Sequence, residues 1–171
     1  MHNTERFSGL SAIRQKWAVA ELKVSFKATK KTNVFVHKAW DAACIVRAMV
    51  KPATLESTEQ LHLIFLDDAN EVIAFKTLNY RMREIFKEQL NEVTALALAC
   101  RAKKVVMAHN HPHLAGVFSR LDITISELIS HRLNLFEIKL LDHVLITVYG
   151  HTSLTLIGYG LGDKNVDSLY K

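Results

Sequence analysis

The sequence KVVMAHNHPHLAGVFSRLD, residues 104–122, joins an apolar run to a group of histidines and then to a serine and an aspartate. Residues 104–108 predict a short apolar strand, and Pro112, which has no N–H for a β-ladder, predicts its end. Ser119 has the chemistry of a helix N-cap, and Asp122 stands three residues later, as in a capping box. The stretch therefore predicts a strand, a loop and the start of a helix.

The flanking sequence predicts further strands and helices. Apolar runs bounded by turn residues predict strands, and apolar positions three and four residues apart predict helices. Strands are expected at residues 18–26, 59–67, 71–77, 104–108, 138–148 and 153–157, and helices at 36–50, 80–102 and 120–135. The first half of the segment 80–102 could instead be a loop. Hairpins are expected to join the second strand to the third and the fifth to the sixth. These elements indicate an α/β fold with a mixed β-sheet flanked by helices.

The spacing also predicts the buried faces of the helices at 36–50 and 120–135. In the helix at 36–50 the expected buried positions are Val36, Trp40, Ala43, Cys44 and Met49. In the helix at 120–135 they are Leu121, Ile125, Leu128, Ile129 and Leu133.

Length and composition indicate an ordinary globular protein. The 171 residues are 49% hydrophobic and 23% charged, so we expect one domain over residues 1–171, with 1–16 as a frayed N-terminal lead. Cys44 and Cys100 lack the spacing of a zinc site, which predicts buried, reduced thiols and a cytoplasmic location. Neither a signal peptide nor a membrane span is expected.

The net charge of +5 is unevenly distributed. Basic residues far outnumber acidic ones between residues 14 and 51, whereas residues 52–75 contain neither lysine nor arginine. A basic N-terminal third could contact nucleic acid or an acidic protein surface. The alternative is a solvated edge strand and loop, in which lysines discourage edge pairing. No recognition-helix or aromatic-platform pattern accompanies the lysines, which favours the second interpretation.

Two histidines at the end of the predicted strand suggest a metal site. If the chain stays extended to residue 111, His109 and His111 project from the same face. Asp122, in the first turn of the next helix, can return to that strand end, which would give the three protein ligands of a hydrolytic zinc site. Taken singly, each residue has an ordinary structural alternative, since a histidine at a strand end is often only hydrogen-bonded and an aspartate after a serine is often only a cap.

Hydrolysis at such a site also needs a base and a donor to the oxyanion. Glu59 begins the apolar strand at 59–67, where a carboxylate could be placed over a metal. Ser119, just ahead of Asp122, is the best-placed hydroxyl to donate to a tetrahedral intermediate. We therefore expect Glu59 and Ser119 as catalytic residues.

The spacing His109-x-His111-x7-Ser119-x2-Asp122, with a glutamate upstream, resembles the JAMM motif of the MPN/JAB metalloproteases. The string AHNHP and the later LLDH at residues 140–143 are more closely similar to RadC, the bacterial branch often named as a DNA repair protein. The resemblance extends from about residue 19 onward. It implies an MPN/JAB-like, cytidine-deaminase-like layered fold, with Zn²⁺ held by His109, His111 and Asp122. It also implies that Glu59 activates water, that Ser119 polarises the scissile carbonyl, and that the substrate is a peptide or isopeptide.

The chain departs from the RadC pattern in two respects. The family usually continues HNHP with Ser-Gly, whereas this chain has His113-Leu114, and LAGVF replaces the polar loop before the serine. His113 is either an additional ligand or, as we favour, a surface residue beyond Pro112. The family's N-terminal helix-hairpin-helix module is not expected, because the chain has no room for it. Of Asp142 and His143, at most one can face the site from a strand, in a supporting or structural role.

Three classes of function are compatible with this pattern. The first is a zinc-dependent peptidase or isopeptidase. The alternatives are a non-catalytic scaffold that acts through protein contacts and a DNA-associated factor that uses the basic N-terminal third. A nucleobase deaminase is excluded because its H-x-E and PCxxC segments are missing.

Overall fold

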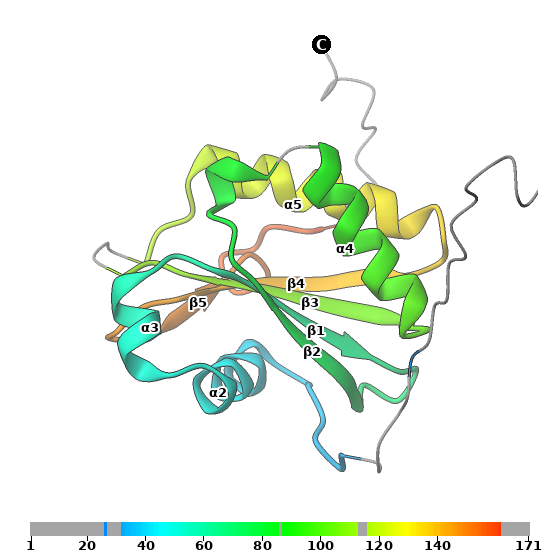
Figure 1. The fold of residues 1–171 in the computed structure, drawn as a ribbon, viewed down its shortest axis with the longest axis horizontal. Helices are drawn as coiled ribbons and strands as arrows, with labels where there is room; N and C mark the ends of the chain where they lie inside the picture. The colour runs from blue at the N-terminus through cyan, green and yellow to red at the C-terminus, as the bar shows by residue number, and fades with distance from the viewer. Residues whose placement is uncertain (1–25, 27–31, 86, 113–115, 162–171) are drawn as a thin grey trace, which may run out of the picture.

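The computed structural model describes residues 26, 32–85, 87–112 and 116–161, and in these it forms a five-stranded mixed sheet with the order β2-β1-β3-β4-β5 (Figure 1). The strands are β1 (Leu61–Leu66), β2 (Val72–Leu78), β3 (Lys104–Asn110), β4 (Lys139–Ile146) and β5 (His151–Ser153). Neighbouring strands are antiparallel except β3 and β4, which are parallel. The predicted α/β fold with a mixed sheet is confirmed. The strand expected at 18–26 lies almost entirely outside the described residues.

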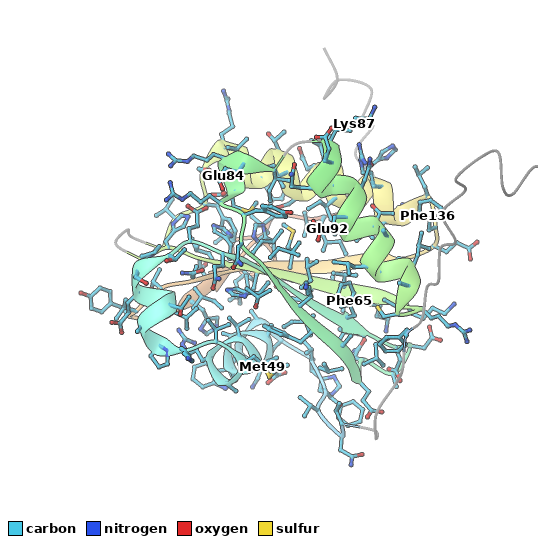
Figure 2. The ribbon with its side chains drawn as sticks, viewed as in Figure 1. Met49, Phe65, Glu84, Lys87, Glu92 and Phe136 are labelled. Carbon is cyan, nitrogen blue, oxygen red and sulfur yellow. The ribbon has the colours of Figure 1, made fainter. Side chains whose placement is uncertain are left out.

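Helices cover both faces of the sheet (Figure 1). On one face lie α2 (Ala39–Met49) and α3 (Pro52–Ser57), and on the other lie α4 (Lys87–Ala99) and α5 (Arg120–Asn134), with a short 3₁₀ turn, η1 (Met82–Glu84), before α4. Each face has its own apolar cluster, one beneath α2 and one beneath α4 and α5. Figure 2 shows Phe65 of β1 on the face that is covered by α4. None of the described helices combines the length and the apolar character that a bilayer crossing requires.

The buried face of α2 differs from the prediction. The residues on it are Ala39, Ala42, Ala43 and Val46. Of the predicted set, Ala43 is buried and Val36, just before the helix, is buried, but Trp40 and Met49 are 54% and 61% exposed, and Cys44 is exposed rather than buried. Small side chains let a helix approach a sheet closely, and this close packing outweighs the greater hydrophobicity of the tryptophan and methionine.

The buried stripe of α5 also differs, in a way that concerns function. Ile125, Ile129 and Leu133 are buried as predicted, and Leu128 is half-buried, but Leu121 is 45% exposed. The stripe instead includes Asp122 and Ser126, which are 2% and 0% exposed. Two polar residues thus occupy positions that the hydrophobic pattern alone would assign to the outside. Buried polar positions of this kind are expected at functional sites.

Two element boundaries differ from the prediction, and one short helix, α3, was not predicted. The last strand ends at Ser153, and residues 154–158 form turns instead of a strand at 153–157. In the segment 80–102, α4 begins at Lys87, after η1, which agrees with the loop alternative for the first part of this segment. Pro52 does follow the end of α2, but it also occupies the first turn of α3, where its missing N–H has no cost.

Candidate metal centre

The fold brings the carboxyl end of β3 next to the amino end of α5. His109 lies in β3, His111 follows the last residue of the strand, and Asp122 is in the first turn of α5. In a sheet with parallel strands, such a strand end beside a helix start is a common location for a ligand site. Side chains alternate along β3, so His109 faces the α5 side while Asn110 faces the α2 side.

His109, His111 and Asp122 converge on one point. Each offers one ligand atom, and these atoms lie within 4.8 Å of one another. His109 Nε2 is 3.0 Å from His111 Nε2 and 3.8 Å from Asp122 Oδ1. His109 is fully buried, and Asp122 is nearly so. The predicted ligand set is therefore assembled in space and could hold a metal ion.

The contact between His109 and Asp122 is not an ion pair. Burial lowers the pKa of His109 well below its ordinary value, and the neighbouring His143, His111 and His62 lower it further. A neutral imidazole carries a proton on one ring nitrogen only, so the other presents a lone pair. A divalent cation fits a group of such electron-pair donors, because two nitrogens and one carboxylate oxygen are ordinary ligands of zinc.

Asp122 serves the helix and the site with different oxygens. Oδ2 accepts a 2.6 Å hydrogen bond from the Ser119 N–H, and Ser119 Oγ accepts one of 3.1 Å from the Asp122 N–H. This reciprocal pair is the predicted capping box, and it is confirmed. Oδ1 is the oxygen that faces His109. The cap and the metal-ligand interpretations of Asp122 are thus compatible.

Glu59 is half-buried in the loop between α3 and β1, outside the three-residue cluster. Leu61, two residues after Glu59 and the first residue of β1, pairs with His109. The loop therefore lies at the same end of the sheet as the histidines. Glu59 Oε1 accepts a 2.8 Å hydrogen bond from the Met82 N–H, which orients the carboxylate. The catalytic roles of Glu59 and Ser119 stay predictions.

Asn110 holds the loop that carries Glu59. Its Oδ1 accepts a 2.9 Å hydrogen bond from the Gln60 N–H, and its Nδ2 donates to the carbonyl oxygens of Leu55 and Thr58 at 2.9 and 2.7 Å. Asn110 separates the two histidines in sequence and projects from the other face of β3. The HNH sequence therefore places two candidate ligands on one face and a loop anchor on the other.

His143 is the member of the Asp142-His143 pair that faces the site. Its imidazole contacts His109, whereas Asp142 Oδ1 accepts from the N–H groups of His143 and Thr155. The ring of Phe118 lies 5.9 Å from that of His109 and 5.1 Å from that of His143, between centroids. Phe118 belongs to the loop in which this chain departs from the RadC pattern. His113 lies outside the described residues.

The sequence interpretation missed Asn110, Phe118 and Ser126. Ser126 donates a hydrogen bond to the backbone oxygen of Asp122 and contacts His143. One signal was available for it, because a residue four positions after Asp122 lies on the same helix face. The roles of Asn110 and Phe118 depend on contacts that local sequence does not encode.

The fold and the site together define a JAB/MPN-like domain, with a His-x-His pair at a strand end and an aspartate at the start of the next helix. The family model for the RadC-like JAB domain matches residues 37–159, and the chain belongs to this family.

The two curated relatives compared below are both UPF0758 proteins. The chain is 35% identical over 88 residues to a UPF0758 protein of Chromohalobacter salexigens, which covers 52% of this chain and 39% of the relative. It is 32% identical over 103 residues to a UPF0758 protein of a Polaromonas species, which covers 56% of this chain and 43% of the relative. The match thus spans about two fifths of the length of these relatives.

Of the nine lysine and arginine residues between residues 14 and 51, six lie outside the described residues. Contact with nucleic acid through this region stays a prediction, as do the protein or peptide substrate and the cytoplasmic location.

Proposed function

We propose that this protein is a zinc-dependent hydrolase that cleaves a peptide or isopeptide bond. The observation that carries the proposal is the convergence of His109, His111 and Asp122, whose candidate ligand atoms lie within 4.8 Å of one another at a buried strand end. Two histidines and one carboxylate are the ligand set of several catalytic zinc sites, in which a fourth position stays open. Membership in the RadC-like JAB family agrees with this assignment.

A bound zinc ion would supply a Lewis acid and lower the pKa of a water molecule toward about 7. The protein's own groups would do the rest. Glu59 is oriented through Oε1 by the Met82 N–H, which leaves Oε2 to take a proton from water and return it to the leaving amine. The Ser119 hydroxyl would donate to the carbonyl oxygen of the substrate as negative charge develops there.

The site is also arranged to limit the access of water. His109 is fully buried, and Phe118 packs against its ring edge. Electrostatic interactions are stronger where water is excluded. The side of His111, which is only partly buried, is the side from which a substrate would approach.

A matched pair of substitutions tests the proposal. Purified protein with zinc added should cleave members of a mixed peptide library, read by mass spectrometry, and Glu59→Gln should lower the rate by at least a hundredfold with zinc content unchanged. Glu56→Gln is the control, since Glu56 is an exposed carboxylate three residues earlier, on α3. Equal rates in the two variants would contradict the role of Glu59. Zinc content unaffected by His109→Ala would contradict the site itself.

A further inference from the structure

A chain of three short hydrogen bonds runs behind the candidate metal centre. His109 Nδ1 is 2.6 Å from His143 Nε2, His143 Nδ1 is 2.6 Å from Ser126 Oγ, and Ser126 Oγ is 2.6 Å from the backbone oxygen of Asp122. The chain therefore starts at the backbone of one candidate ligand, Asp122, and ends on the ring of another, His109. Its two intermediate members, Ser126 and His143, belong to α5 and β4.

The chemistry of the groups fixes the direction of every bond in this chain. A backbone carbonyl oxygen can only accept, so Ser126 must give its single proton to Asp122. Ser126 Oγ must then accept from His143, which places the proton of His143 on Nδ1 and leaves Nε2 as an acceptor. His109 must in turn donate from Nδ1.

His109 Nε2 then carries no proton, because the neutral ring has a single N–H and that N–H is at Nδ1. Both rings are 0% exposed, and burial disfavours the charged form of an imidazole, so each ring carries one proton. The lone pair of His109 Nε2 then points at His111 Nε2 and Asp122 Oδ1. The opposite tautomer would carry a proton there and could not ligate a metal.

Solvent does not compete with this arrangement. His109, Ser126 and His143 are each 0% exposed, and the Phe118 ring lies against both imidazoles. A buried N–H that loses its partner has no water to replace it, so the arrangement that pairs every N–H is favoured. On the Nδ1 side of His109, the hydrogen-bond chain fixes which group donates, whereas the Nε2 side faces the other two candidate ligands, His111 and Asp122.

We propose that Ser126 and His143 are positioning residues that hold His109 in its Nδ1-protonated tautomer and thereby prepare it to bind a divalent metal. This inference rests on the metal site of the proposed function and adds two residues to it. Groups that orient a metal-ligating histidine contribute about 10- to 100-fold to metal affinity. Loss of either residue should therefore weaken metal binding by that factor while every ligand is retained.

The tautomer can be read without any metal. In the metal-free wild-type protein, ¹⁵N-resolved NMR of the histidine rings should show His109 protonated on Nδ1. Ser126→Ala removes the acceptor of His143, so the His143 proton can move to Nε2 and donate to His109. His109 should then show protonation on Nε2 in a substantial part of the population.

Metal affinity gives the second readout, measured with Co²⁺ absorption and with zinc competition against a chelating dye. Ser126→Ala should bind each metal 10- to 100-fold more weakly than Ser153→Ala, a control that removes the same atom from another serine with 0% exposure. His143→Gln can accept from His109 and donate to Ser126 through its amide, so it should bind more tightly than His143→Leu. His62→Leu, at another histidine with 0% exposure, controls for the loss of a buried ring.

The possible results separate this proposal from the preceding one. His109 protonated on Nε2 in the wild-type protein would overturn the hydrogen-bond chain, and this result does not depend on any variant folding. Folded Ser126→Ala protein with the affinity of Ser153→Ala would also overturn it. If the wild-type protein shows the Nδ1 tautomer but binds neither Co²⁺ nor Zn²⁺, the proposed function fails while the hydrogen-bond arrangement stands.

Discussion

Replacing Asn110 with alanine would test how the loop that carries Glu59 is held in place. The substitution removes three hydrogen bonds, one from the Gln60 N–H and two to the carbonyl oxygens of Leu55 and Thr58. These backbone groups flank Glu59 on both sides. The substitution does not alter a candidate ligand, because Asn110 projects from the opposite face of β3.

The expected loss of stability follows from the number of bonds. A hydrogen bond contributes about 1 kcal/mol net, so three give about 3 kcal/mol. The loop is only partly buried, so water can reach some of the freed groups. The loss of stability should therefore stay near about 3 kcal/mol and not rise to the cost of leaving three buried groups without partners. For a domain of this size, about 3 kcal/mol corresponds to a fall in Tm of about 6–12 °C.

Urea unfolding, followed by circular dichroism, measures this change directly. Asn110→Asp keeps the acceptor but turns an oxygen toward the Leu55 and Thr58 carbonyls, so it should destabilise at least as much as Asn110→Ala. Asn91→Ala is the control, since the Asn91 side chain makes an exposed contact with Arg132, and it should cost less than about 1 kcal/mol. If Asn110→Ala costs no more than this control, the proposed anchoring of the loop is refuted.

The remaining predictions concern pH, the helix cap and metal. Burial lowers the pKa of His62 from its ordinary value of about 6.5 to about 4. The contribution of His62 to the free energy of unfolding is therefore complete above pH 6.5 and is lost as the pH falls toward 4. That contribution is about 3 kcal/mol, and urea titrations at several pH values should show a weaker acid loss in His62→Gln; an equal loss would contradict the assignment. Ser119→Ala should cost about 1 kcal/mol and lower peptide hydrolysis, whereas Ser119→Asn should restore the stability but not the rate; restored hydrolysis would argue against a catalytic hydroxyl. Zinc at a hundred times its Kd should stabilise the wild-type protein by about 3 kcal/mol in thermal melts, and an equal gain in Asp122→Ala would place the binding elsewhere.

Local chemistry explains which parts of the site could be predicted from the sequence. The reciprocal bonds between Ser119 and Asp122 span three residues, and the two histidines lie two positions apart on one strand, so short-range rules describe both. The pairing of β1 with β2 follows from an apolar run, a turn and a second run. These features do not require knowledge of the rest of the fold.

The features that were not predicted depend on contacts distant in sequence. Asn110 anchors residues some fifty positions earlier, and His143 reaches His109 only because β4 lies beside β3. The error at α2 has a related cause, since the sheet selects the alanine face for close approach and leaves Trp40 against the ring of His151 at the surface. Hydrophobicity along one helix cannot report on the shape of the surface on which it packs.

Anomalous X-ray diffraction from zinc-soaked crystals, recorded on both sides of the zinc absorption edge, tests the central claim most directly. The account predicts one zinc peak bounded by His109 Nε2, His111 Nε2 and Asp122 Oδ1, absent from crystals of His109→Ala. A zinc-soaked wild-type crystal without a peak at this position, or with its only peaks at other residues, would contradict it.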